Sequence, residues 1–277
     1  MDWCMGNYHY RRFSLESFLS EMERRNINKI ELWASGPSLH LEDFSASRLD
    51  ALGKDIRRRG LSLTCLTPET CSYPISLASN DESYRKRSLQ FYEDHIEAAQ
   101  ILECPLLLVT PGVTVLDTDQ EVAYQRLLEG LDKLATYAGN KGITLALEPL
   151  TRLSTSLLNK ASQLKAILDT IGSPNLKGLL DISVAYRVDK ETAEDYTNAL
   201  GSRLAHIHFT DLDERTGRHH LIPGTGTLAL DEELLVLENA GYNGLLSFEL
   251  LDFQYQSVPS EATDGCIRYI GRKDDLK

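Results

Sequence analysis

Ile143-Thr144-Leu145-Ala146-Leu147-Glu148-Pro149 is a short apolar run that ends in a carboxylate and a proline. Thr144 is its only polar residue before Glu148, so a strand here would have no face suited to water. Strands buried on both faces are typical of parallel sheets covered by helices. Stretches of helical period lie on either side, at Asp119–Asn140 and Lys160–Ile171. This neighbourhood predicts one strand of an α/β fold.

The same alternation of apolar run and helical stretch continues along the whole chain. We expect eight strands, at Trp3–Tyr8, Lys29–Ala34, Leu61–Thr67, Leu106–Pro111, Ile143–Pro149, Leu176–Ser183, Leu204–Asp211 and Gly244–Leu251. The other expected helices are Ser14–Arg25, Ser47–Arg59, Glu82–Leu102, Lys190–Leu200, Asp231–Asn239 and about Ser260–Ile270. Eight such units favour a closed (β/α)8 TIM barrel over an open sheet. Because such barrels commonly use about 250 residues as one domain, residues 1–277 are expected to form a single domain.

The composition is that of a globular protein with an acidic surplus. Of 277 residues, 41 are acidic and 29 basic, which gives a formal charge of −12. That balance counts against nucleic acid as a partner, because a phosphate backbone is bound by basic side chains. No apolar run is long enough for a membrane span, and no secretory signal is expected at the N-terminus. The five cysteines lack Cys-x-x-Cys spacing, which favours a reducing cytoplasm.

Polar side chains gather at the carboxyl ends of four consecutive expected strands: Glu148, Asp181, His208 and Glu249. In a TIM barrel these strand ends meet at one mouth, where active sites lie. Three carboxylates there would repel one another, and a divalent cation is the simplest remedy. The donor set suits Mn²⁺, Mg²⁺, Co²⁺ or a non-structural Zn²⁺ without selecting among them. For each residue alone, a helix cap, a salt bridge or core packing is the alternative interpretation.

Other residues near the expected mouth carry weaker indications. Trp33 ends the second strand, where it could wall a sugar pocket or pack against a helix, and Glu69 lies in the loop after the third strand. His206 faces the same side as His208 but lies deeper, so we interpret it as a supporting or core residue. The long segment through Arg218-His219-His220-Leu221-Ile222-Pro223-Gly224-Thr225-Gly226 is either a functional lid or a mobile surface loop.

Several short motifs accompany these residues: Ile30-Glu31-Leu32-Trp33, Thr67-Pro68-Glu69-Thr70, Tyr73-Pro74, Leu147-Glu148-Pro149-Leu150-Thr151, Asp181-Ile182, His206-Ile207-His208, His220-Leu221-Ile222-Pro223-Gly224-Thr225-Gly226 and Phe248-Glu249-Leu250. With them the chain resembles the xylose-isomerase-like barrels of the sugar phosphate isomerase and epimerase superfamily, in particular its fructoselysine and ketose 3-epimerases. The resemblance spans nearly the whole chain.

The resemblance implies that Glu148, Asp181, His208 and Glu249 bind one divalent metal, and that Glu148 and Glu249 transfer the protons. It implies that His220 binds substrate. Two positions depart from the ketose 3-epimerases. Val184 stands where they carry a histidine, and Ser154 stands where they carry a second glutamate; both positions contact substrate in the family. Such relatives commonly form homo-oligomers, either dimers or tetramers.

The resulting hypothesis is a metal-dependent C3 epimerase of a ketose or amino-linked ketose, in which the metal stabilises a developing enediolate. On the same barrel, an aldose–ketose isomerase of the hydroxypyruvate isomerase kind or an inosose-dehydratase-like lyase are alternatives. A phosphodiesterase of the endonuclease IV type would want more clustered histidines and a basic groove than seven histidines and a charge of −12 suggest. A non-catalytic sugar-binding barrel is a further alternative, for which Val184 and Ser154 speak.

Overall fold

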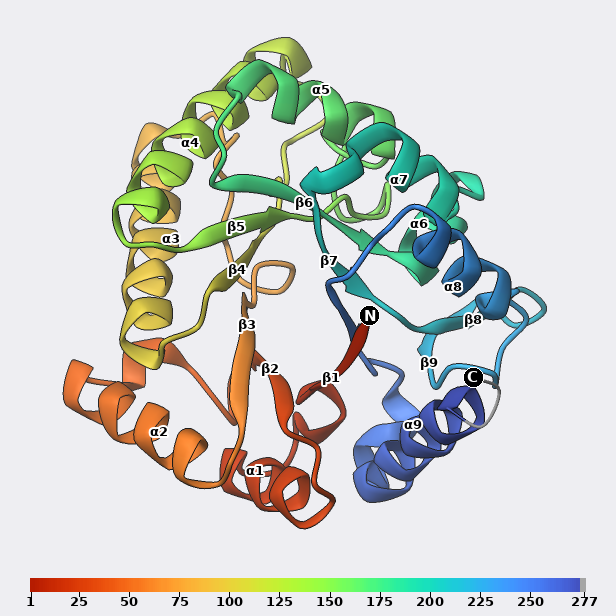
Figure 1. The fold of residues 1–277 in the computed structure, drawn as a ribbon. Coiled ribbons are helices and arrows are strands. Elements are labelled where there is room, and N and C mark those ends of the chain that lie inside the picture. Colours follow the sequence, from red (N-terminus) through yellow and green to blue (C-terminus); the bar gives the residue numbers. More distant parts are fainter. Residues whose placement is uncertain (275–277) are drawn as a thin grey trace.

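The computed structural model describes residues 1–274, and within them eight parallel strands close into a barrel (Figure 1). The strands are β1 (Asp2–Gly6), β2 (Lys29–Ala34), β3 (Ser62–Pro68), β4 (Leu106–Val109), β5 (Thr144–Leu147), β6 (Leu176–Asp181), β7 (Leu204–His208) and β10 (Leu245–Phe248). Their order around the barrel is β1-β10-β7-β6-β5-β4-β3-β2, so successive barrel strands are neighbours and the last closes on the first. The TIM barrel predicted from the sequence is confirmed.

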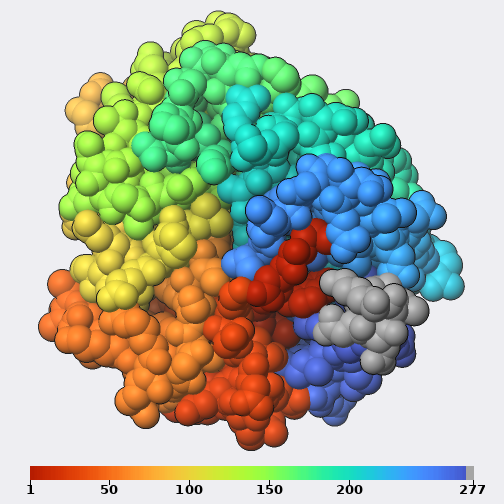
Figure 2. Space-filling view, viewed as in Figure 1, coloured from red at the N-terminus to blue at the C-terminus, as the bar shows by residue number. Residues whose placement is uncertain are grey.

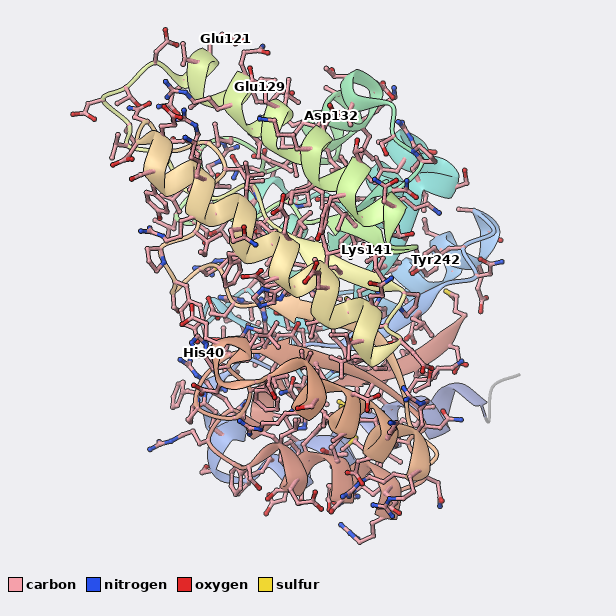
Figure 3. The ribbon with its side chains drawn as sticks, turned by 90° about the vertical axis from the view of Figure 1, so that its left-hand side faces the viewer. His40, Glu121, Glu129, Asp132, Lys141 and Tyr242 are labelled. Carbon is pink, nitrogen blue, oxygen red and sulfur yellow. The ribbon has the colours of Figure 1, made fainter. Side chains whose placement is uncertain are left out.

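Helices cover the outside of the barrel: α1 (Leu15–Arg24), α2 (Ala46–Arg58), α3 (Glu82–Leu102), α4 (Gln120–Asn140), α5 (Ala161–Ile171), α7 (Ala193–Leu200), α8 (Leu230–Asn239) and α9 (Pro259–Asp274). Helix α4 shows why they lie there. Ala123 and Leu127 on its inner face are buried, whereas Glu121, Glu129 and Asp132 are exposed on its outer face (Figure 3). An apolar stripe opposite a charged one is the pattern of a helix packed on a core. None of the helices in residues 1–274 is long and apolar enough to cross a bilayer.

Several elements differ from the sequence-based expectation. The first strand ends at Gly6, and Tyr8–Tyr10 form a 3-10 turn, η1, instead of continuing the strand. The sixth strand ends at Asp181, which caps an unpredicted helix, α6 (Ile182–Asp189). The long segment after β7 contains an antiparallel hairpin, β8 (Asp211–Asp213) and β9 (Arg218–Leu221). Further 3-10 turns are η2 (Leu41–Asp43), η3 (Gly201–Arg203) and η4 (Phe253–Ser257).

The two ends of the barrel sequence meet along one pair of strands. β1 pairs in parallel with β10, with Asp2 opposite Leu245 and Met5 opposite Phe248. Figure 2 shows the red N-terminal residues beside the blue C-terminal part of the chain. The ring of Trp3 stacks on Phe248 with centroids 5.3 Å apart, so aromatic packing reinforces this closure.

His9 gives the fold a predictable sensitivity to acid. It is buried in η1, where its Nε2 lies 2.9 Å from Thr263 Oγ1 of α9, and burial lowers the pKa of His9 to about 3. Below about pH 6.5 the unfolded chain binds a proton at His9 that the folded chain does not bind, so acidification favours unfolding. Between pH 6.5 and 5 this costs about 2 kcal/mol. We therefore expect a His9→Gln variant to lose that much less stability over this range in denaturant titrations.

His40→Gln, a change at a partly exposed histidine outside η1, is measured alongside as the control. A His9→Gln chain whose stability falls as steeply with acid as that of the wild type would contradict the assignment.

Candidate metal centre

The structure brings Glu148, Asp181, His208 and Glu249 together at the carboxyl end of the barrel. Asp181 and His208 are the last residues of β6 and β7, and Glu148 and Glu249 directly follow β5 and β10. One donor atom from each lies within 4.8 Å of the others. His208 Nδ1 is 2.7 Å from Glu249 Oε2, 3.4 Å from Glu148 Oε1 and 3.9 Å from Asp181 Oδ2. All four side chains are buried.

The chemistry of this cluster fits a divalent cation. Asp181 Oδ2, His208 Nδ1 and Glu249 Oε2 are buried atoms without a hydrogen-bond partner. Burial raises the pKa of Glu148, and raises that of Glu249 well above its usual range, although His208 acts against both shifts. Carboxylate ligands bind a metal in the ionised form, and a bound cation would add positive charge beside three buried carboxyl groups. The four residues are thus candidate holders of one divalent ion.

Asp181 is oriented by the helix that follows it. As the N-cap of α6, its Oδ1 accepts hydrogen bonds from the Val184 amide at 2.8 Å and the Ser183 hydroxyl at 2.9 Å. The Asp181 carboxylate therefore has two roles: Oδ1 caps helix α6, and Oδ2 faces the cluster. Val184 itself is buried in the first turn of α6.

His220 lies beside the cluster on β9. Its backbone has a φ of 56°, in the left-handed region that non-glycine residues rarely adopt. Its Nε2 lies 3.7 Å from Asp181 Oδ2 and its Nδ1 lies 3.8 Å from Glu249 Oε2, yet neither nitrogen has a hydrogen-bond partner. Burial lowers the pKa of His220 to about 4, so the ring is neutral near pH 7. A neutral imidazole offers one donor and one acceptor to a hydroxylated ligand.

The hairpin that carries His220 is tied down by a carboxylate that sequence reasoning missed. Asp211 Oδ2 accepts from the amides of Gly224 and Gly226, both at 2.9 Å, and Oδ1 accepts from those of Leu212 at 2.8 Å and Leu228 at 3.1 Å. A Cβ at Gly226 would lie 2.4 Å from Asp211 Oδ1, so only glycine fits. The signal was an aspartate ahead of a glycine-rich turn whose amides need an acceptor. The segment contains an antiparallel hairpin followed by a turn, so it is not a loop without secondary structure.

This clamp predicts a large loss of stability in Asp211→Asn. The amide group would keep one acceptor oxygen but turn an NH2 toward two backbone N–H groups. Hydrogen bonds to charged groups contribute about 1.5–3 kcal/mol each, so we expect a loss of about 3 kcal/mol in urea unfolding. Asp213→Asn is the matched control, because Asp213 lies on the same hairpin and pairs with the exposed Arg215. Equal losses in both variants would contradict the clamp.

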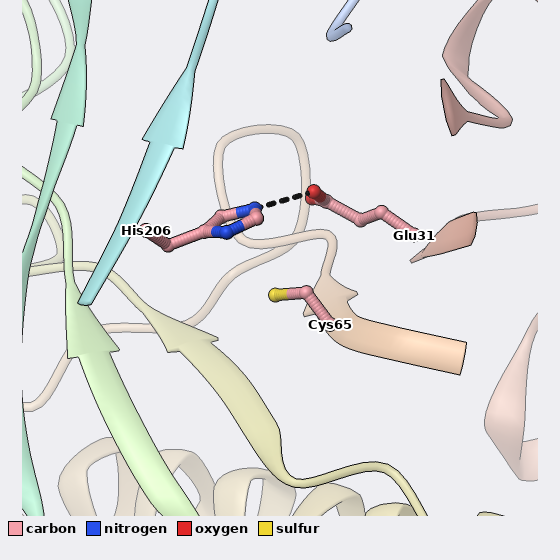
Figure 4. Close-up of side chains that lie close together, drawn as sticks. All are labelled: Glu31, Cys65 and His206. Carbon is pink, nitrogen blue, oxygen red and sulfur yellow. Dashed lines mark hydrogen bonds and ion pairs between the residues drawn. The ribbon is translucent and has the colours of Figure 1, made fainter. Parts of the chain in front are cut away.

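A second buried carboxylate, Glu31 of β2, lies deeper in the barrel. Its Oε1 accepts from the Tyr8 and Thr67 hydroxyls, both at 2.6 Å, and lies 3.1 Å from His208 Nε2. Its Oε2 lies 2.8 Å from His206 Nε2 (Figure 4). Despite burial, His208 and His206 hold the pKa of Glu31 well below its usual range. His206 thus has the supporting place expected for it, whereas the part played by Glu31 was not foreseen.

Glu31, Cys65 and His206 are also close enough together to be considered as metal ligands (Figure 4). Their surroundings differ from those of the upper cluster. Among the described residues, the buried polar atoms that lack a partner include none from these three side chains. Burial also raises the pKa of the Cys65 thiol well above its usual range, and a thiol that does not ionise is a poor ligand. This group is therefore a hydrogen-bonded support.

Trp33 is buried near the candidate metal centre. Its ring stacks on Tyr8 with centroids 5.3 Å apart, and the Arg11 guanidinium lies 5.3 Å from the Trp33 ring centroid. The Tyr8 ring is in turn 6.2 Å from that of His208. Trp33 is thus one aromatic ring removed from the cluster.

Glu69 and Ser154 each have a partner in their own loop. Glu69 is buried, and its Oε1 accepts from the Ser72 amide at 2.6 Å. The Ser154 hydroxyl lies 3.2 Å from Thr151 Oγ1. Contacts of Trp33, Glu69, Ser154 and Val184 with a substrate stay predictions.

A cavity of about 550 Å³ lies elsewhere, on the outer side of the barrel. It is lined by the loops after β2 and β3 and by α3, with His40, Tyr73, Phe91 and His95 among the lining residues. None of the residues predicted to bind metal or substrate lines it. The cavity is therefore separate from the candidate metal centre.

Comparison with known proteins identifies the family of this barrel. The chain belongs to the family described as xylose isomerase-like TIM barrel, which matches residues 20–266. It is 28% identical over 250 residues to fructoselysine 3-epimerase of Shigella flexneri, covering 90% of each chain. Relatives of this kind are named epimerases and isomerases, and the chain is an enzyme of that class.

Solved structures share the fold. D-psicose 3-epimerase from Clostridium cellulolyticum H10, solved with D-tagatose, superposes with a TM-score of 0.77 at 19% identity, covering 97% of this chain and 99% of that one. A protein named IolI, solved with a bound zinc atom, superposes with a TM-score of 0.80 at 20% identity. The superposition covers 97% of this chain and 96% of IolI.

Proposed function

We propose that this enzyme is a metal-dependent sugar epimerase that inverts C3 of a ketose or an amino-linked ketose. The observation that carries the proposal is the convergence of Glu148, Asp181, His208 and Glu249, where three buried donor atoms make no hydrogen bond. The named activities of relatives, fructoselysine 3-epimerase and D-psicose 3-epimerase, support the same reaction.

Glu148 and Glu249 are the proposed acid–base pair. Inversion requires one group to remove the C3 proton from one face of the sugar and another to return a proton on the opposite face. The two glutamates follow β5 and β10, which are separated by β6 and β7 in the barrel, so they approach the mouth from different sides. Burial raises the pKa of both carboxyl groups, and a positioned carboxyl group can serve as general acid or as general base. A divalent cation held by the cluster would polarise the sugar carbonyl as a Lewis acid.

The remaining residues are assigned to holding and orienting. Asp181 and His208 complete the ligand set. His220 is placed to exchange a hydrogen bond with a sugar hydroxyl, because both of its nitrogens are free. Trp33, Glu69, Ser154 and Val184 are the further proposed substrate contacts. Of Mn²⁺, Mg²⁺, Co²⁺ and Zn²⁺, we take Mn²⁺ as the first ion to test, since oxygen donors dominate the set.

Incubation of the enzyme with Mn²⁺ and a ketose panel in D2O tests the reaction. The panel contains D-fructose, D-tagatose and fructoselysine. We expect the C3 epimer of one of them as product, with one deuterium at C3. An aldose product would instead establish aldose–ketose isomerisation, and loss of water would establish a dehydratase. No turnover and no exchange with any of them would count against the proposed substrate class.

The assembly and location of the enzyme extend the proposal. We expect a dimer or tetramer in the cytoplasm, as first inferred from the family resemblance and the cysteine pattern. Light scattering of the purified chain measures its oligomeric state, and a monomer at micromolar concentration would contradict the expected dimer or tetramer.

A further inference from the structure

We infer that Glu31 is a positioning residue that fixes the ring of His208, so that its Nδ1 faces the three carboxylates and the cation they would hold. The inference rests on the proposed metal centre and adds a residue to its working parts. Two contacts on opposite edges of one ring carry it. His208 Nε2 lies 3.1 Å from Glu31 Oε1, and His208 Nδ1 lies 2.7 Å from Glu249 Oε2.

The contact with Glu31 determines which ring nitrogen carries hydrogen. Both hydroxyl groups beside Glu31, those of Tyr8 and Thr67, donate to its Oε1. A carboxylate has no hydrogen to give, so His208 must present an N–H at Nε2. Nδ1 is then the nitrogen that would bind a cation, on release of the proton it shares with Glu249. Metal-binding histidines commonly donate their second N–H to a carboxylate in this way, which sets both tautomer and ring orientation.

Glu31 is itself held firmly enough to act as a fixed reference. It is completely buried, and its other oxygen, Oε2, lies 2.8 Å from His206 Nε2. Its partners come from three elements: Tyr8 lies in η1, Thr67 in β3, and the two histidines in β7. Of the two strands, β3 is next to β2 in the barrel and β7 is not. The His208 side chain is fully buried, so bulk water reaches neither of its ring nitrogens. The ring is therefore set by the protein before any ion arrives.

Titration calorimetry with Mn²⁺ on the full chain tests this positioning. We expect Glu31→Gln to bind Mn²⁺ about 10- to 100-fold more weakly than the wild type, the range found when such supporting partners are removed. Glu42→Gln is the matched control, because the Glu42 side chain is exposed and lies in the loop after the same strand. Glu31→Asp keeps the charge but shortens the reach to His208. Weakened binding in Glu31→Asp as well would show that position matters beyond charge.

The absorption spectrum of bound Co²⁺ gives a readout that a general loss of stability would not move. A changed ligand-field spectrum in Glu31→Gln at saturating Co²⁺ is expected, since the histidine donor would be reoriented. A Glu31→Gln chain with wild-type Mn²⁺ affinity and an unchanged Co²⁺ spectrum would overturn the inference.

The wild type supplies a test that does not depend on folding of the variants. In the Zn²⁺-loaded, ¹⁵N-labelled chain, NMR should show His208 with hydrogen on Nε2 and the metal on Nδ1, with the signals assigned by their loss in His208→Asn. Zinc on Nε2 would overturn the inference. Failure of the wild type to bind Mn²⁺ or Zn²⁺ would instead refute the metal centre of the proposed function.

Discussion

Glu249→Gln is expected to keep the fold and to lose C3 epimerisation together with exchange of solvent deuterium into the sugar. Glutamine has the size of glutamate but can neither take nor return a proton at C3. General acid–base groups contribute about 10² to 10⁴-fold, so turnover should fall by that factor even at saturating Mn²⁺. The exchange is measured by NMR in D2O, and saturating metal separates lost catalysis from lost metal affinity.

The same variant should lose activity but not stability when no metal is bound. Burial raises the pKa of Glu249 well above its usual range, so its charge is costly in the empty cluster. Without metal, Glu249→Gln should unfold at the wild-type temperature or above it. Glu238→Gln, an exposed change on α8, should alter neither activity nor stability. Retained deuterium exchange in Glu249→Gln would remove Glu249 from the reaction.

Chelation of divalent ions is expected to abolish activity and to lower the unfolding temperature. Three carboxylates meet at one buried imidazole, and the proposed cation would balance their charge. An ion that binds the folded chain at about 100 times its Kd adds about 2.7 kcal/mol of stability. Thermal unfolding after EDTA treatment, with and without added Mn²⁺, measures the effect.

The same experiment has an internal control. His208→Asn removes the nitrogen donor, so Mn²⁺ should raise its unfolding temperature much less than that of the wild type. If none of Mn²⁺, Mg²⁺, Co²⁺ and Zn²⁺ shifts the unfolding temperature of the wild type, the cluster does not bind a cation and the proposed mechanism fails.

The parts of the fold that could be predicted from sequence are those with a strong local pattern. Helix α4 keeps a helical period over its whole length and was found with nearly the right bounds. The apolar run at Ile143–Leu147 located β5, although the strand ends at Leu147 and not at the predicted Pro149. Strand β8 has three residues and β9 has four, which is too short for any periodicity to emerge. Helix α6 was hidden because Asp181 looks like the end of a strand and is also an N-cap.

The candidate site divides along the same line. Glu148, Asp181, His208 and Glu249 could be found because each lies at the end of an apolar strand, and strand ends of a barrel meet. Glu31 could not, since its histidine partners are 175 and 177 residues away and the pairing depends on the register across the barrel. A general signal did exist: a carboxylate inside an apolar strand must have a partner.

The pairing of β1 with β10 has a consequence for the chain as it is made. Strand β1 pairs with two strands: β2, which follows it next in the sequence, and β10, which begins only at Leu245. Glu249 follows β10 directly, so the last proposed ligand leaves the ribosome together with the strand that completes the ring. A nascent chain that stops short of this point offers a cation three of the four donors in an open sheet. Pairing of β10 with β1 therefore both closes the barrel and brings the fourth proposed ligand to the other three.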